Sequence, residues 1–199
     1  MKLAQLVLAA SAAVFSLGLA AEPQVGAPAP DFTVVDSKGN SHSLKDFAGK
    51  NVVLEWTNHD CPFVVKHYSG NMQALQAEMK QQDVVWLSVI SSAPGKQGHV
   101  SGAKADELTA SRSAMPTAVV FDESGVVGKA YDAKTTPHMY VIDKAGVLQY
   151  MGGIDSIPSA KVADIAKATP YFANAAKAVL TGKAPDPAVT KPYGCSVKY

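Results

Sequence analysis

The sequence predicts an α/β sandwich, with a central mixed sheet flanked by helices, and three observations lead to this fold. Short apolar runs alternate with segments of helical periodicity between residues 51 and 131. A hairpin pattern follows at residues 139–150, and a helical segment covers residues 159–181. Strands that alternate with helices, followed by a hairpin and a last helix, are typical of this architecture. One domain accounts for the whole pattern.

Length and charge narrow the class of protein. The chain has 199 residues, which suffices for one domain with a sizeable core. Its 18 Lys and Arg residues against 17 Asp and Glu give a formal net charge of +1. A nucleic-acid partner would call for a basic excess gathered on one face, so none is predicted.

The first residues differ from the rest of the chain. Lys2 is the only charge before Glu22, and residues 3–19 are almost entirely apolar. This pattern predicts a secretory signal peptide over residues 1–20, cleaved near Ala20 or Ala21. The alternative is an uncleaved anchor, because the run is just long enough to span a bilayer. Cleavage is favoured, so we expect a periplasmic or secreted protein with no stable membrane insertion.

Several elements of the mature chain are readable. An extended proline-rich segment (21–30) precedes a strand and hairpin turn near residues 32–40. Buried strands are predicted at residues 51–56 and 83–90. A helix with a bend at Gly70 is expected after Cys61, and its apolar stripe consists of Val65, Tyr68, Met72, Leu75 and Met79. A helix at 105–113, a strand at 116–121 and a weak helical or extended link at 126–131 follow. The last elements are the hairpin at 139–150 and a helix at 159–181 that is divided at Pro170.

Cys61 stands where a buried strand gives way to a helix. Pro62 suits the first helical position, because the N–H that it lacks would be unpaired there. A helix N-terminus stabilises a thiolate and lowers the pKa of the cysteine. His59, Lys66 and His67 are expected to add positive charge nearby. A reactive Cys61 is therefore favoured over a structural one, which would more often lie inside an element.

A second signal is the sequence TTPH at residues 135–138, which precedes an apolar strand. Proline cannot donate to a strand ladder, so Pro137 needs a special reason to be there, and a cis peptide bond is one. A cis bond would expose the backbone of Thr136 beside the thiol, where an extended substrate can pair with it. We expect His138 to be a surface strand residue or a substrate contact.

Cys195 is the only other cysteine, and it lies in a short C-terminal tail. It is either a resolving thiol, which condenses with an oxidised Cys61, or one half of a permanent disulfide. In the chain-entropy model such a bridge contributes about 4–5 kcal/mol. Both interpretations follow from an exported location. The chain has no C-x-x-C pair and no zinc-ligand spacing, so neither a metal nor a cofactor is predicted.

Glu55 is the one charge in a predicted buried strand. It is either a proton-transfer group near Cys61 with a raised pKa or a solvent-facing residue at the end of the strand. A metal site made of Cys61 with His59, His67 and His138 is disfavoured, because no ligand spacing supports it.

Two blocks of sequence resemble the redoxin group of the thioredoxin superfamily. VGAPAPDFTVVDSKGNSHSLKDFAGKNVVLEW is similar to the opening of that group, which includes peroxiredoxins of the alkyl hydroperoxide reductase/thiol-specific antioxidant type and TlpA-like thioredoxins. AYDAKTTPHMYVIDKAGVLQY resembles the group's second hallmark, a cis-proline before a strand. The resemblance covers residues 25–154. It implies a thioredoxin-like fold, thiol redox activity and Pro137 in the cis-proline place. We expect the domain to span residues 25–183, with a tail at 184–199.

The chain also departs from both branches of the group. TlpA-like proteins carry W-C-x-x-C, whereas Cys61 is alone here. Peroxiredoxins carry P-x-x-x-T-x-x-C, whereas this chain has Asn58 in the threonine position and Thr57 one residue away. Arg112, the single arginine of the chain, is the candidate for the family's catalytic arginine.

Two hypotheses follow from these residues. In the first, Cys61 reduces a peroxide or a disulfide, Cys195 resolves the intermediate, and a periplasmic dithiol protein restores the thiols. Thr57, Asn58, His59, Glu55 and Arg112 are then candidate supporting residues, and Thr136 and Pro137 contact the substrate backbone. In the second, the chain is a binding module for a metal or a protein, with a static Cys61–Cys195 disulfide.

Overall fold

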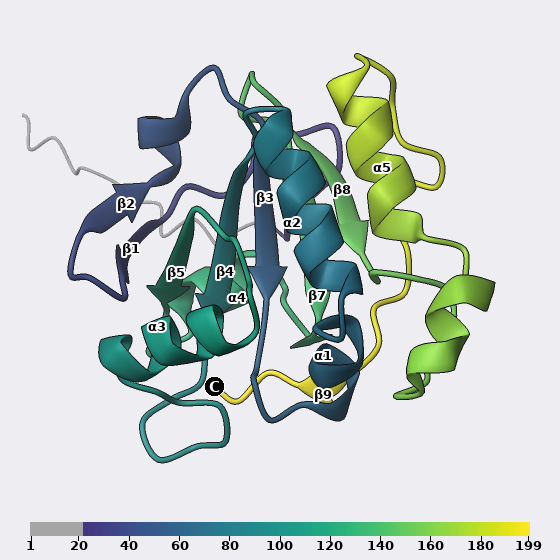
Figure 1. Cartoon of the computed structure of the whole chain (residues 1–199). Helices are drawn as coiled ribbons and strands as arrows, with labels where there is room; N and C mark the ends of the chain where they lie inside the picture. Colours follow the sequence, from purple (N-terminus) through teal and green to yellow (C-terminus); the bar gives the residue numbers. More distant parts are fainter. Residues whose placement is uncertain (1–21) are drawn as a thin grey trace, which may run out of the picture.

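The computed structural model describes residues 22–199, and the predicted signal peptide at residues 1–20 lies outside them. The described chain forms the expected α/β sandwich around a seven-stranded sheet (Figure 1). The sheet has the order β2-β1-β5-β4-β3-β7-β8. Its strands are β1 (Thr33–Asp36), β2 (Ser41–Ser43), β3 (Val52–Trp56), β4 (Val85–Ile90), β5 (Ala118–Phe121), β7 (His138–Ile142) and β8 (Leu148–Gly152).

The sheet is mixed, which confirms the predicted fold class. β3 runs parallel to β4, and β4 runs parallel to β5. The remaining pairs of the sheet are antiparallel, including β3 with β7 and β7 with β8. Two further strands, β6 (Thr135–Thr136) and β9 (Cys195–Ser196), pair with each other in a separate small sheet.

Helices cover both faces of the sheet. In Figure 1, α2 (Asn71–Gln81), α3 (Gly102–Ser111) and α5 (Tyr171–Leu180) lie in front of the strands, and α4 (Val126–Ala130) lies behind them. The short helix α1 (Pro62–His67) lies at the lower end of β3. Two 3₁₀ turns, η1 (Leu44–Phe47) and η2 (Val162–Lys167), complete the set.

Alternation along β3 divides the core in two. Leu54 and Trp56 point to the cluster that includes Val127 of α4. Val53 points to the opposite cluster, where Phe172 of α5 packs edge-on against Trp86 with ring centroids 5.4 Å apart. All five residues of β3 are buried, as expected for a central strand covered on both faces.

The predicted helix after Cys61 is interrupted at Gly70. Gly70 has a φ of +132°, a conformation open to glycine, and it separates α1 from α2. Met72 and Met79 are buried as predicted, but Val65 is 52% exposed. Placing Val65 in the buried stripe was wrong, because the helical phase restarts at Gly70.

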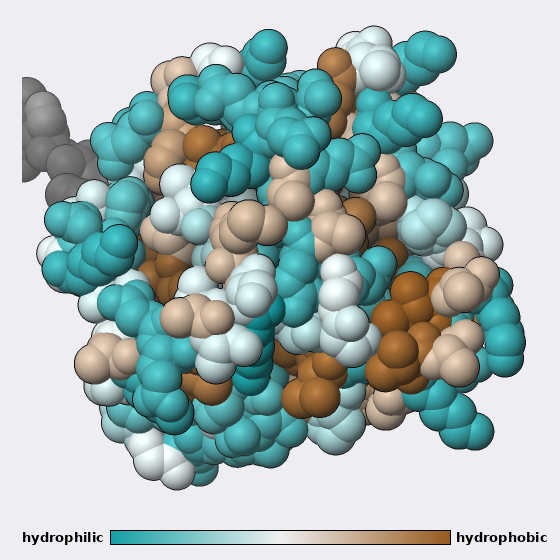
Figure 2. Space-filling model, in the orientation of Figure 1, coloured by the Kyte–Doolittle hydropathy of each residue, from teal (hydrophilic) through white to brown (hydrophobic). Residues whose placement is uncertain are grey.

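The surface in Figure 2 is mostly hydrophilic over α2 and α3, whereas hydrophobic atoms gather at its lower right, over α1 and η2. The exposed large apolar side chains of these two elements are Val65 and Val162. None of the helices in the described chain combines the length and apolar character that a bilayer crossing requires.

Phe172→Ala should lower the free energy of unfolding by about 3–5 kcal/mol, because it leaves a cavity between α5 and the sheet. Urea unfolding measures this change. Val162 is 53% exposed, so Val162→Ala should stay within about 0.5 kcal/mol of wild type. Equal effects of the two substitutions would contradict the packing described for α5.

Candidate active site

Cys61 lies where the polypeptide leaves β3 and enters α1. It is the N-cap residue of α1, with Pro62 in the first turn, as the sequence predicts. The Cys61 N–H donates to the Asn58 carbonyl at 3.0 Å, which closes the loop between strand and helix. The cysteine is fully buried in the resting structure. Whatever reacts with this sulfur must therefore first gain access to it.

The turn before β7 faces the cysteine. The peptide bond between Thr136 and Pro137 is cis, as predicted. The Thr136 carbonyl oxygen accepts a hydrogen bond from the Cys61 Sγ at 3.1 Å. The two sequence signals, although far apart along the chain, therefore meet at one point.

The C-terminal tail brings Cys195 to the same point. Antiparallel pairing of β6 with β9 places Cys195 opposite Thr136, which brings its thiol close enough to Cys61 for each thiol to shift the pKa of the other. Both cysteines are free thiols. The expectation of an exposed Thr136 backbone was wrong, because the chain's own tail pairs with it.

The two thiols differ in acidity. Burial raises the pKa of Cys61, but hydrogen bonds from the Cys195 side chain, the Val64 and Cys195 backbone and the Thr136 side chain outweigh it, so the pKa lies below its ordinary value. Burial and the neighbouring Cys61 raise the pKa of Cys195 to about 11. Cys61 is therefore the thiol that loses its proton first.

Glu55 is fully buried, which excludes the solvent-facing alternative. Its carboxylate accepts hydrogen bonds from Trp86 Nε1 at 2.9 Å, Ser88 Oγ at 3.0 Å and Tyr68 OH at 2.9 Å. Burial raises the pKa of Glu55, although these hydrogen bonds oppose the shift. Its role in proton transfer stays a prediction.

Thr57, His59 and Arg112 line a cavity of about 40 Å³ between α3 and the sheet. The Thr57 hydroxyl has no hydrogen-bond partner within the described residues. Arg112 donates to the His59 carbonyl at 3.1 Å and stacks on the Tyr68 ring. The side chains of these three residues therefore lie at the cavity.

The Asn58 side chain is held by its own loop and by Gln97. Its amide donates to the Gln97 carbonyl at 3.3 Å and accepts from the Asp60 N–H at 3.0 Å. The catalytic roles predicted for Thr57, Asn58, His59 and Arg112 stay predictions.

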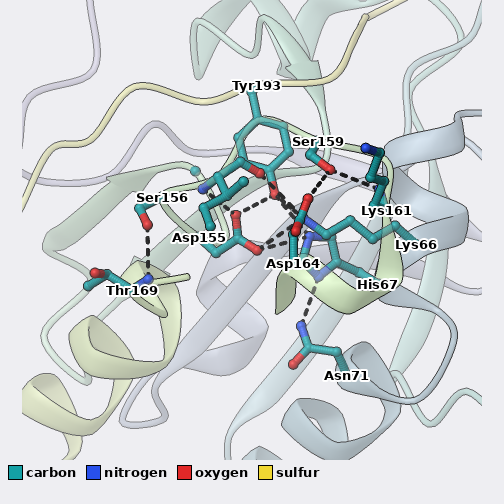
Figure 3. A network of polar contacts seen from close by, with 12 residues as sticks. Lys66, His67, Asn71, Asp155, Ser156, Ser159, Lys161, Asp164, Thr169 and Tyr193 are labelled. Atoms are coloured by element: carbon teal, nitrogen blue, oxygen red, sulfur yellow. Dashed lines mark hydrogen bonds and ion pairs between the residues drawn. The ribbon is translucent and has the colours of Figure 1, made fainter. Parts of the chain in front are cut away.

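Sequence reasoning missed a buried polar network next to the cysteine helix (Figure 3). Lys66 Nζ donates to Asp155 Oδ2 at 3.3 Å, to the Ile157 carbonyl at 3.3 Å and to Tyr193 OH at 3.2 Å. Tyr193 OH in turn donates to Asp155 Oδ1. Asp155 and Tyr193 carry no local pattern that would have revealed this association with α1.

Two histidine predictions were wrong, the positive charge at His67 and the surface position of His138. The alternative that His138 contacts the substrate stays a prediction. His67 is fully buried, and burial together with Lys66 lowers its pKa to about 4, so it adds no positive charge near neutral pH. His138 is 5% exposed and not a surface residue; its Nδ1 contacts Tyr140 OH at 2.9 Å. Burial lowers the pKa of His138 to about 3.

A strand–loop–cysteine–helix unit that faces a cis-proline turn defines a redoxin of the thioredoxin superfamily. The profile of the AhpC/TSA family matches residues 25–151, and the chain belongs to this family. The resemblance stated from sequence is thereby confirmed.

Two curated relatives carry the name thiol-disulfide oxidoreductase ResA. The protein of Geobacillus kaustophilus (strain HTA426) is 31% identical over 122 residues, and that of Geobacillus thermodenitrificans (strain NG80-2) is 30% identical over 122 residues. Each match covers 61% of this chain and 65% of the relative, which is just under two thirds of its length.

Solved structures share the fold. The hypothetical protein SMc02350 of Sinorhizobium meliloti 1021 is 22% identical, with a TM-score of 0.74 over 90% of this chain and 96% of its own. The thioredoxin domain of thiol-disulfide oxidoreductase BVU-2223 from Bacteroides vulgatus is 19% identical, with a TM-score of 0.52 over 72% of this chain and 96% of its own.

Glu55→Gln should change how stability depends on pH. The folded-state pKa of Glu55 is raised, so its contribution is present below the ordinary value of 4.5 and is lost as pH rises through the folded value. The free energy of unfolding of wild type, measured by urea at several pH values, should therefore fall relative to Glu55→Gln above about pH 4.5.

Glu78→Gln is the matched control, because Glu78 is exposed on α2. The difference in free energy of unfolding between Glu78→Gln and wild type should stay nearly constant over the same pH range. A constant difference for Glu55→Gln as well would contradict the burial of that carboxyl group.

Proposed function

We propose that the protein is an exported thiol–disulfide oxidoreductase in which Cys61 attacks the substrate and Cys195 resolves the intermediate. The observation that carries this proposal is the pairing of Cys195 opposite Thr136, because this pairing places the Cys195 thiol beside the more acidic Cys61 thiol. The names of the curated relatives support the same reaction class.

The reaction conserves atoms and electrons in two exchanges. The Cys61 thiolate attacks one sulfur of a partner disulfide, the partner's S–S bond breaks, and the departing sulfur leaves as a thiolate that takes up a proton. Cys195, once deprotonated, then attacks the Cys61 sulfur and expels the second partner sulfur in the same way. The partner gains two electrons and two protons, and the chain ends as a Cys61–Cys195 disulfide.

A disulfide fits this site better than a peroxide. The Asn58 side chain donates to the Gln97 carbonyl, and the Arg112 side chain donates to the His59 carbonyl. Thr57 lines the cavity next to α3. These are the side chains that a peroxide would need beside the thiolate. Family membership alone keeps hydrogen peroxide as a substrate worth testing.

The cycle needs export and a source of electrons. The apolar start of the sequence supports export. We propose that the Cys61–Cys195 disulfide is reduced by another dithiol protein of the periplasm. The alternative, a binding module with a permanent disulfide, predicts a bridge that resists such a reductant.

Cys61→Ser should slow reduction of glutathione disulfide by about 100-fold or more, because the nucleophile is lost. Cys195→Ser should instead trap glutathione on Cys61, and mass spectrometry of the intact mature protein would show this adduct. Ser196→Ala, next to Cys195, is the control and should behave as wild type. A pulse of hydrogen peroxide on the reduced protein tests the peroxide arm in parallel.

Wild-type turnover by Cys61→Ser would contradict the proposal. So would a Cys61–Cys195 reduction potential below about −300 mV, the range of structural disulfides, which would favour the static module.

A further inference from the structure

β6 has one strand partner within the described chain, and that partner is the chain's own tail. In Figure 1 the yellow tail descends from α5, passes α1 and crosses the lower end of the molecule. A short strand edge is a surface on which extended peptides dock by adding a strand. The tail therefore covers a potential docking surface beside Cys61.

The register of this pairing delivers a sulfur to the reactive thiol. Cys195 lies opposite Thr136, and the Thr136 carbonyl contacts the Cys61 Sγ at 3.1 Å. The Val197 N–H donates to the Lys134 carbonyl at 3.1 Å, which extends the pairing beyond β9. An extended segment that bound in this register, with a cysteine at the position of Cys195, would place that cysteine against Cys61.

The residue before the cysteine is restricted. Gly194 has a φ of +141°, and a Cβ at this position would collide with the Thr136 carbonyl oxygen. Because that oxygen belongs to the backbone of β6, it cannot swing away as a side chain would. The edge therefore accepts glycine before the cysteine and excludes larger residues.

The residue two before the cysteine has a prepared place. The Tyr193 ring packs edge-on against Phe63, with centroids 5.7 Å apart, and the Lys66 ammonium lies 5.4 Å from its centre. Its hydroxyl joins the buried Lys66–Asp155 pair shown in Figure 3. An aromatic residue is thus selected at this position.

A groove adjoins this edge and is lined in part by the tail itself. It has a volume of about 690 Å³, and its lining includes Thr135, Pro158, Tyr171, Thr190 and Gly194. It therefore begins at β6 and continues along the tail.

We propose that β6 is the docking edge for an extended segment of the partner protein with the order aromatic residue, glycine, cysteine, and that Tyr193–Gly194–Cys195 is an internal copy of that segment. This inference rests on the proposed function, because the partner's cysteine reacts at Cys61. The partner segment displaces residues 193–196 of the tail. The Cys61 thiolate then attacks the partner's cysteine, whose former sulfur partner leaves as a thiolate and takes up a proton, and a mixed disulfide forms. When β9 returns, Cys195 attacks the Cys61 sulfur and the partner's cysteine leaves with a proton.

The far end of the tail is held independently of the reacting groups. Tyr199 OH donates to the Ala133 carbonyl at 2.8 Å, and its ring lies against the backbone at Gly125 and Gly128. The Lys129 ammonium lies 5.5 Å from the ring centre. Tyr199→Ala should therefore loosen β9 without altering Cys61 or β6.

The test uses the reduced mature chain with Cys195→Ser, with and without Tyr199→Ala. The probe is a synthetic peptide that copies residues 191–199 (KPYGCSVKY), with its cysteine joined to thionitrobenzoate. Attack by Cys61 on the peptide sulfur releases coloured thionitrobenzoate. A second peptide carries alanine in place of glycine, and the symmetrical thionitrobenzoate disulfide reports the reactivity of Cys61 without a peptide.

The glycine peptide should react at least about tenfold faster than the alanine peptide, because only glycine fits the edge. Tyr199→Ala should raise the rate of the glycine peptide about tenfold by favouring local opening of the tail. Val35 is exposed on β1, outside the groove and the tail, and Val35→Ala should leave the rate unchanged.

Equal rates for the two peptides, with the small disulfide still reactive, would overturn the docking inference and leave the proposed function standing. An unchanged rate in Tyr199→Ala would overturn the tail's place as an internal copy. A Cys61 inert to every disulfide, even with the tail loosened, would overturn the proposed function and this inference together.

Discussion

The antiparallel pairing of β6 with β9 is the interaction on which the chemistry of this molecule depends. The two strands have only two residues each, yet their register places Cys195 opposite Thr136. Through that pairing Cys195 lies near Cys61 and helps to lower the pKa of Cys61 despite its burial. This chain has no C-x-x-C pair, and the second thiol near Cys61 is that of Cys195 in the tail.

Because two residues of strand provide few hydrogen bonds, contacts on both sides hold the tail in place. On one side Tyr193 enters the buried network of Lys66 and Asp155. On the other side Tyr199 packs near Lys129. Buried polar networks favour one arrangement strongly when all their members are satisfied. These contacts hold the tail over Cys61 in the resting structure. In the proposed cycle the tail moves away from Cys61 when the contacts of Tyr193 and Tyr199 break.

Much of the fold could be predicted from local patterns. Apolar strands with turn residues between them predicted the mixed sheet, and the position of Cys61 before Pro62 predicted its place at a helix N-terminus. The cis bond before Pro137 was also predictable, since a proline before a buried strand needs a reason. These features depend on residues that are neighbours in the sequence.

The parts that escaped prediction depend on long-range contacts. The partners of Lys66 and the register of β9 are set by the path of the tail, for which the sequence of residues 184–199 gives no period. His67 and His138 look like sources of charge or surface groups in the sequence, but burial keeps both neutral. The burial of Glu55 also became clear only from the side chains around it, Trp86 of β4 and Tyr68 just after α1.

An NMR titration of the two cysteine Cβ atoms in the reduced protein tests most directly whether the tail holds Cys195 beside Cys61. Cys61 should titrate below its ordinary pKa of 9.0, while Cys195 keeps its proton until about 11. Cys195→Ser should then alter the titration of Cys61, because its neighbour is changed. Two independent titrations, both near the ordinary value, would show that the tail does not hold Cys195 against Cys61.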